Sequence, residues 1–460
     1  MKTPALLALA ASLTFTTLTA TAADQTSYKF QFGADTAAPG YTLVAPTAAY
    51  AKTPGYGFEP GARLTAVSQP GGDPLHTGAV TAAGAFMFSV AVPEGNYRVT
   101  VTLGDPKAET SATVKAESRR LMVENVHLTA GQFETHTFTV NVRGPKLSAG
   151  GEVNLDSREM NLDTHVAISR AWDDRLTVAF SGAHPAVAAI EVTPAPDAIT
   201  VFVCGDSTVT DQPSGGSWGQ MFPRWFKPEV AVANHAESGE TMKGFLKERR
   251  WDKVLDTLKA GDYVVIEFGT NDSKARGPQN IYPNQDFSET YAPADGLYRD
   301  LLKQFVADVR KKGGNPIIAS PSARRGETNP AAGSLHAYAE AAMATAKELG
   351  VPAINLNAMG IDLNNALGAD AAKQFADGTH HAEYGAYLQA KCIVLGIQQA
   401  GLPLAKFIVD DYGTFDPKHP APLPGAFALP NDAGGRGAGG GGRRGGAAPA
   451  AAAVPAAPTP

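Results

Sequence analysis

The sequence predicts an antiparallel β-sandwich followed by an α/β domain built on a parallel sheet. Short runs that alternate apolar and polar residues, such as Tyr97–Leu103, fill residues 24–193 between Gly, Pro and Asn residues. This period of two is typical of an antiparallel sandwich. From residue 199 onward, apolar runs such as Ile199–Val203 alternate with helix-period stretches such as Leu297–Arg310, which is typical of a parallel sheet with helices on both faces.

The chain begins with the features of a secretory signal over residues 1–22. Lys2 supplies the positive start, Ala5–Leu18 the apolar core, and Ala20–Ala22 the small residues for cleavage. No later stretch is long and apolar enough to span a bilayer, so we expect a secreted or periplasmic protein without a membrane anchor. A net charge of −6 gives no footprint for nucleic acid or an anionic membrane, and we expect neither partner.

The sandwich part contains further alternating runs at Tyr28–Phe32, His136–Val142 and Leu176–Phe180. Near its end, Trp172, Asp173 and Arg175 either face a ligand or pack and cap a strand. Thr193–Asp197 then forms a short stiff linker, because its prolines fix φ and block pairing.

The α/β part contains five apolar runs that we expect to be parallel strands: Ile199–Val203, Val230–Ala233, Tyr263–Phe268, Pro316–Ala319 and Ala353–Leu356. Open α/β sheets bind ligands at the edge where the carboxyl ends of such strands meet. Polar segments follow three of the strands, and a fourth precedes a helical stretch: Cys204–Thr208, Asn234–Gly239, Gly269–Asp272 and Asp377–His380.

The ends of this part add two expectations. Cys204 ends a predicted core strand and Cys392 lies on a predicted helix, so we expect two buried free thiols rather than a bridge, although export permits one. Residues 425–460 are dominated by Gly, Ala and Pro, and we expect disorder because they cannot bury enough apolar surface. The arginines of this tail either contact acidic polysaccharide or, as we expect, are passive: Arg436, Arg443 and Arg444.

The four polar segments hold the groups that acyl transfer at a serine requires. The Ser207 hydroxyl is a poor nucleophile at neutral pH and needs a base such as His380, whose pKa lies near that pH. Asp377, three residues before His380, can hold the other ring nitrogen. Asn271 carries an amide donor for a developing oxyanion, and Gly239 lets the backbone approach a substrate oxygen closely.

Together these segments resemble those of the GDSL or SGNH hydrolases, most closely the rhamnogalacturonan acetylesterase branch, over about residues 199–400. The resemblance implies a three-layer α/β/α, flavodoxin-like hydrolase domain over residues 199–410. It implies that Ser207 is the nucleophile, His380 the general base and acid, and Asp377 the group that orients the imidazole.

It further implies an oxyanion hole made by the backbone N–H groups of Ser207 and Gly239 and the side-chain amide of Asn271, with no metal or organic cofactor. Residues 24–193 resemble, less specifically, the galactose-binding-like β-sandwich modules that are often joined to carbohydrate esterases.

Several neighbouring residues allow two interpretations. Asp206 either caps a following helix or contacts substrate. His235 either lines the pocket or is a hydrogen-bonded structural histidine. His381 is a pocket-wall or surface residue, and a metal site that combines it with Asp377 and His380 lacks a complete ligand set.

The chain departs from the family pattern at two places. Glu240 and Thr241 stand where the relatives tend to carry Arg and Ser. Thr270, another candidate substrate contact, stands before Asn271 where a His is common. Asn271 alone would be interpreted as a turn former. Since no catalytic group is lost, the reaction type is better defined than the substrate.

We therefore expect an exported carbohydrate esterase that removes O-acetyl groups from a pectin-type polysaccharide or oligosaccharide through an acyl-Ser207 intermediate. A lipase or thioesterase acting on longer acyl chains is the alternative within the same fold. The alternative from another class is a carbohydrate-binding protein whose hydrolase domain has lost activity. The presence of every proposed catalytic group counts against that last alternative.

Overall fold

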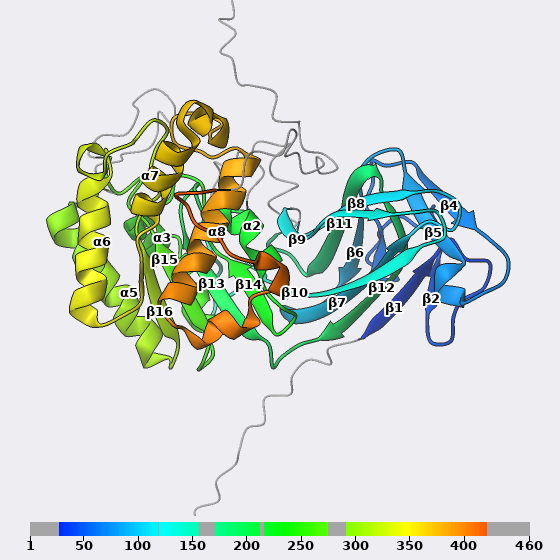
Figure 1. Ribbon diagram of the computed structural model, residues 1–460. Helices are drawn as coiled ribbons and strands as arrows, with labels where there is room; N and C mark the ends of the chain where they lie inside the picture. Colours follow the sequence, from blue (N-terminus) through cyan, green and yellow to red (C-terminus); the bar gives the residue numbers. More distant parts are fainter. Residues whose placement is uncertain (1–26, 118, 156–170, 212–215, 275–290, 421–460) are drawn as a thin grey trace, which may run out of the picture.

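The computed structural model describes residues 27–117, 119–155, 171–211, 216–274 and 291–420 (Figure 1). The predicted signal segment 1–22 and the predicted tail 425–460, with Arg436, Arg443 and Arg444, lie outside the described residues. In the described ranges, no helix combines the length and the apolarity needed to cross a membrane. The predicted domain boundaries stay predictions.

Two sheets packed face to face form the amino-terminal part (Figure 1). Its strands are β1 (Tyr28–Phe32), β2 (Thr42–Val44), β3 (Tyr56–Phe58), β4 (Leu64–Ser68), β5 (Gly78–Ala82), β6 (Phe86–Ala91), β7 (Gly95–Gly104), β8 (Thr110–Ala116), β9 (Arg120–Leu128), β10 (Phe133–Val142), β11 (Arg175–His184) and β12 (Ala186–Pro194). Apart from the parallel β1–β2 pair, these strands pair with one another antiparallel. Their inward residues, among them Phe30, Phe88 and Val101, form one apolar core. The predicted sandwich is therefore confirmed.

A parallel sheet with helices on both faces forms the second part. Its strands, in the order β17-β16-β15-β13-β14, are β13 (Ile199–Gly205), β14 (Val230–Asn234), β15 (Tyr263–Glu267), β16 (Asn315–Ala319) and β17 (Ala353–Ile354). The α-helices are α2 (Trp218–Met221), α3 (Met242–Lys247), α4 (Arg250–Thr257), α5 (Arg299–Lys311), α6 (His336–Leu349), α7 (Leu356–Leu367) and α8 (Glu383–Gln399). All the strands predicted for this part are present, and the predicted three-layer α/β/α fold is confirmed.

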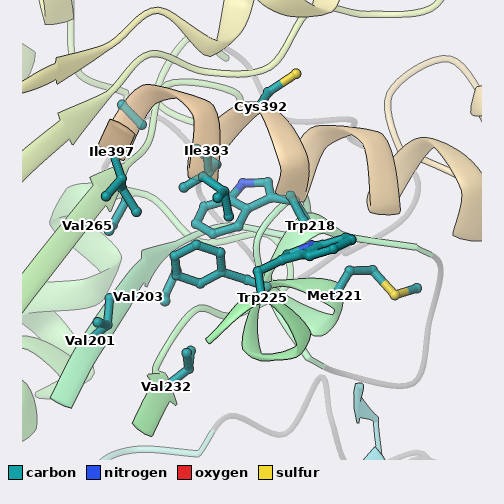
Figure 2. Packing of buried hydrophobic residues seen from close by; sticks show 14 of the residues in the cluster. Val201, Val203, Trp218, Met221, Trp225, Val232, Val265, Cys392, Ile393 and Ile397 are labelled. Carbon is teal, nitrogen blue, oxygen red and sulfur yellow. The ribbon is translucent and has the colours of Figure 1, made fainter. Parts of the chain in front are cut away.

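Each face of the parallel sheet has its own apolar core. On one face, Phe202 and Ile266 of the strands pack with helices α3 to α6. On the other face, helices α2, α7 and α8 cover the sheet. Figure 2 shows Val203 and Val265 below Ile393 of α8, with the indoles of Trp218 and Trp225 beside them. The two cysteines, Cys204 and Cys392, are buried and free, as predicted.

One continuous 12-stranded sheet runs through both parts of the protein. The junction is a parallel pair between β10 of the sandwich and β14, with Thr139 opposite Ala231 and Val140 opposite Val232. Since β14 would otherwise be an edge strand of the hydrolase sheet, β10 covers its open hydrogen-bonding groups. A buried hydrogen bond of 2.9 Å from Asn96 Nδ2 to Thr200 Oγ1 strengthens the same junction.

The prediction of a stiff linker over Thr193–Asp197 is wrong for its first two residues. Thr193 and Pro194 still belong to β12, opposite Arg98 and Tyr97 of β7. A proline is tolerated there because it lies at the end of a strand, where a missing N–H costs little.

Candidate active site

The segment after β13 makes a tight turn that presents Ser207. A Cβ at Gly205 would lie 2.5 Å from the Glu267 carbonyl oxygen, so only glycine fits where the turn begins. Asp206 is fully buried, and its Oδ1 accepts hydrogen bonds from the N–H (2.9 Å) and the hydroxyl (3.0 Å) of Thr208. Its carbonyl oxygen also accepts from the N–H groups of Val209 and Thr210. Asp206 thus caps the turn itself rather than a helix, because α2 begins only at residue 218.

Ser207, His380 and Asp377 form a hydrogen-bonded line. His380 Nε2 lies 2.9 Å from Ser207 Oγ, although the residues are 173 positions apart in the chain. His380 Nδ1 lies 2.7 Å from Asp377 Oδ2. A carboxylate only accepts, so Nδ1 carries the ring proton and the Nε2 lone pair faces the Ser207 hydroxyl. This tautomer can take the serine proton.

The Asp377 carboxylate is held in its ionised form. Its Oδ1 accepts the N–H groups of Thr379 (2.7 Å) and His380 (2.8 Å) in a short turn. Burial alone would raise the pKa of Asp377, but these hydrogen bonds and the His380 ring lower it to about 2. An ionised carboxylate in this position can stabilise a protonated imidazole ring.

Asn271 lies against the loop that contains Gly239. The residue is 5% exposed, and Nδ2 donates a 2.9 Å hydrogen bond to the carbonyl oxygen of Glu240. Gly239 has φ +85°, a conformation that favours glycine. Because Gly239 and Asn271 follow β14 and β15, which flank β13, both loops lie at the sheet edge that carries Ser207.

A pair of buried carboxyl groups lies beside the Ser207 turn. Thr208 Oγ1 is 3.0 Å from Asp206 Oδ1 and 3.0 Å from Glu267 Oε2. A hydroxyl has one proton to donate, so both contacts are full hydrogen bonds when one of the two carboxyl groups keeps its proton and donates it to Thr208. Burial and the Asp206 charge raise the pKa of Glu267 well above its usual range. We therefore place the proton on Glu267.

His235 packs in the junction between the two parts rather than at the surface. It is 1% exposed, and its ring meets Trp172 edge-on at 5.4 Å and Phe202 at 5.6 Å. Burial, together with neighbouring cationic side chains, lowers its pKa well below the usual range. This position favours the structural interpretation of His235 over substrate contact.

His381 and Thr270 are buried as well. His381 stacks on Phe375 with a centroid distance of 4.8 Å, and burial lowers its pKa to about 3. It is therefore neutral and is not a surface residue. The Thr270 carbonyl oxygen accepts a hydrogen bond from the Ser273 hydroxyl. Thr241, one of the departures from the family pattern, caps α3 by accepting the Gly244 N–H.

Two arginines of the sandwich hold the chain just after the Ser207 turn. Arg120 Nε lies 2.7 Å from Asp211 Oδ2, and Arg143 Nη2 lies 3.6 Å from Asp211 Oδ1, all three side chains being almost fully buried. The Arg143 guanidinium also lies over the Trp172 ring, 4.5 Å from its centroid. Trp172 thus packs in the junction.

Asp173 and Arg175 pair with each other at 2.8 Å, and Arg175 also pairs with Glu59 at 3.2 Å. The contacts of these two residues, like those of Trp172, favour the packing interpretation. In the described part of the chain, no cluster of three or more His, Cys, Asp or Glu side chains is arranged to hold a metal ion.

Comparisons with known proteins show the family of this chain. Residues 203–386 match the GDSL-like Lipase/Acylhydrolase family, and residues 28–150 match the Beta-agarase/YXIM esterase-like, galactose-binding domain-like family. Rhamnogalacturonan acetylesterase RhgT of Bacillus subtilis (strain 168) is 33% identical over 237 residues, which cover 47% of this chain and 96% of the relative. The chain belongs to the GDSL-like lipase/acylhydrolase family. As a GDSL-like acylhydrolase, it is a carboxylic-ester hydrolase.

Relatives of this acylhydrolase also extend over the sandwich. The uncharacterized esterase YxiM of Bacillus subtilis (strain 168) is 26% identical over 399 residues, which cover 83% of this chain and 93% of YxiM. The crystal structure of Bacillus subtilis YxiM shares 21% identity, with a TM-score of 0.40, and covers 82% of this chain and 99% of that one.

Sequence reasoning missed some residues of the site of this acylhydrolase. Glu267 lies in a predicted strand that is otherwise apolar. A Glu inside such a strand does indicate a paired carboxyl group, because buried Glu is rare unless it is paired. Lys274, whose Nζ lies 2.6 Å from Asn271 Oδ1, follows the predicted segment by two residues. Asp211 pairs with arginines about 90 and 70 residues away in sequence, and nothing local marks that pairing.

Proposed function

We propose that this acylhydrolase is a carbohydrate esterase that removes acetyl groups from a rhamnogalacturonan-type pectin polysaccharide or oligosaccharide. The observation that carries the proposal is the line from Ser207 Oγ through the His380 ring to Asp377. The similarity to RhgT, named a rhamnogalacturonan acetylesterase, supports the acetyl group and the class of sugar. The galactose-binding-like match over residues 28–150 supports a saccharide substrate.

In the proposed first step, Ser207 Oγ attacks the acetyl carbonyl carbon while its proton passes to His380 Nε2. The N–H groups of Ser207 and Gly239 and the Asn271 amide donate hydrogen bonds to the oxyanion. The bond to the sugar oxygen then breaks, and that oxygen takes the proton from His380. The products of this step are a sugar hydroxyl and acetyl-Ser207.

In the second step, water attacks acetyl-Ser207 and gives a proton to His380 Nε2. The acetyl–serine bond breaks, Ser207 Oγ takes the proton back, and acetic acid leaves and releases its own proton to the solvent. Asp377 stays ionised throughout and stabilises the imidazolium. Neither step requires a group beyond these side chains and amides.

Ser207→Ala tests the proposed nucleophile. We expect acetate release from acetylated pectin to fall at least about 10³-fold, whereas Ser27→Ala, at an exposed serine beside β1 of the sandwich, leaves it unchanged. Undiminished hydrolysis in Ser207→Ala would contradict the proposal.

Acyl-chain profiling separates the alternatives. Matched chromogenic esters of acetate and octanoate report the preferred acyl length, and a preference for octanoate would favour a lipase or thioesterase. Saccharide binding without turnover of any ester would favour a non-catalytic binding protein.

We also propose that the protein is exported after removal of residues 1–22, that residues 24–193 are an accessory domain, and that residues 199–410 are the catalytic domain. The charge, apolar core and small residues at the start of the sequence support export. Amino-terminal sequencing of the mature protein should find Ala23 or Asp24 first. A mature protein that retains Met1 would contradict export by this route.

A further inference from the structure

The amide of Asn271 has only one orientation that its neighbours allow. The Glu240 carbonyl oxygen, 2.9 Å from one end of the amide, can only accept a hydrogen bond. The Lys274 ammonium, 2.6 Å from the other end, can only donate one. The NH₂ group therefore faces Glu240 and the oxygen faces Lys274. Turning the amide over would set donor against donor and acceptor against acceptor.

This orientation assigns the two N–H bonds of Asn271. One N–H donates to the Glu240 carbonyl, which follows Gly239 in the chain. The second N–H can then donate to a substrate oxygen at the edge where Gly239 and Ser207 lie. Without Lys274, the Asn271 oxygen would lose its charged partner, and only the hydrogen bond to Glu240 would still hold the amide in place.

The Lys274 ammonium also bears on the strength of this donor. Its hydrogen bond to Asn271 is charge-assisted and short, the kind that is about twice as strong as a neutral one. A positive charge at the amide oxygen draws electrons from the nitrogen, and hydrogen bonds in such a chain strengthen one another. Burial lowers the pKa of Lys274, and the negative charge of Asp206 opposes that shift. The charge of Asp206 therefore helps to retain the ammonium.

We propose that Lys274 is a positioning residue for ester hydrolysis: it fixes and polarises the Asn271 amide so that one N–H is presented to the oxyanion. The proposal rests on the proposed function and on the role of Asn271 in the oxyanion hole. It adds a residue that acts through Asn271 and touches no reacting atom itself.

The test compares steady-state kinetics of full-length variants on a soluble acetyl ester. Since Lys274 acts in the transition state, we expect Lys274→Met to lower kcat about tenfold with KM within about twofold. Lys274→Arg, which keeps the charge and a donor, should recover most of that loss. Lys311→Met, at an exposed lysine of α5, is the matched control and should match the unmodified enzyme.

A double-variant cycle separates positioning from a merely structural role. Asn271→Ala should lower kcat about 10²- to 10³-fold. If Lys274 acts only through Asn271, adding Lys274→Met to Asn271→Ala should change kcat less than about twofold. If Lys274→Met still lowers kcat about tenfold in the Asn271→Ala variant, the proposal is wrong. It is also wrong if Lys274→Met alone keeps full activity.

Failure of the wider proposal gives a different result. If Asn271→Ala or Ser207→Ala keeps full activity, the proposed oxyanion hole or nucleophile is wrong, whatever Lys274 does. If Lys274→Met shows a changed thermal unfolding midpoint, Lys274→Arg decides: recovery of kcat supports positioning, and no recovery with a restored midpoint opposes it.

Discussion

Replacing Glu267 with glutamine tests the proton that the Thr208 hydroxyl requires. Thr208 Oγ1 lies 3.0 Å from carboxyl oxygens of both Asp206 and Glu267, and the buried Glu267 has a pKa well above its usual range. In the native protein Glu267 therefore keeps a proton that an unfolded chain releases above about pH 4.3. The stabilisation that the protonated Glu267 gives the native state is complete below about pH 4.3, and it is lost as the pH rises toward the native pKa of Glu267.

The size of the effect follows from the number of protons. One proton retained by the native state and released on unfolding changes the free energy of unfolding by about 1.4 kcal/mol per pH unit. Glutamine cannot ionise, and its NH₂ group can donate to Thr208 as the protonated carboxyl does. From about pH 5 upward, the free energy of unfolding of the unmodified protein should therefore fall relative to that of Glu267→Gln by about 1.4 kcal/mol per pH unit, until the pH reaches the native pKa of Glu267.

Urea unfolding at several pH values measures this difference. Glu340→Gln, on the exposed face of α6, serves as the control. Its free energy of unfolding should depend on pH as that of the unmodified protein does. Glu267→Gln should also keep its esterase activity within about twofold, because the hydrogen bond to Thr208 is kept. Parallel pH dependences of Glu267→Gln and the unmodified protein would refute the assignment of the proton to Glu267.

Three further substitutions test other parts of the structure. Asp377→Asn should lower kcat about 10⁴-fold because the amide favours the wrong His380 tautomer. Hydrogen bonds hold the pKa of Asp377 at about 2, so protonation of this carboxylate should lower kcat of the unmodified enzyme only as the pH falls toward 2. A loss of kcat near about pH 4 that is traced to Asp377 would oppose this. Arg120→Met leaves Asp211 buried with a weaker partner and should lower the free energy of unfolding, measured with urea, by about 3–5 kcal/mol. Adding Asp211→Asn should restore part of that free energy. Equal stability of the single and double variants would contradict the pairing. Gly205→Ala places a Cβ 2.5 Å from the Glu267 carbonyl and should lower the thermal midpoint and kcat together, and a variant with unmodified kinetics would show that the turn tolerates a side chain.

The parts of the site that are local in sequence could be predicted well. Asp377 and His380 lie in one short turn, and their spacing alone suggests the 2.7 Å contact that the structure contains. Ser207 follows an apolar run that ends in glycine, which indicates a strand end. The approach of Ser207 and His380 across 173 residues came from resemblance to a family, since no local pattern encodes it.

The parts that depend on non-local pairing could not be predicted. Strand patterns predicted β10 and β14 separately, but alternation does not say which strand covers which edge. Likewise, a lysine after Gly269–Asp272 looks like any loop lysine until the fold places it against Asn271. The interpretation of His235 depended on its burial, which the sandwich supplies from a distant part of the chain.

The shared sheet bears on how this enzyme can be shortened. A truncated chain that starts near Ile199 would keep every group of the Ser207–His380–Asp377 line, yet the flank of β14 would become a bare template for aggregation. The Asp211 carboxylate would lose both of its cationic partners at the same time. Engineering a minimal esterase from this chain therefore requires either a replacement strand beside β14 or new charges on its rim.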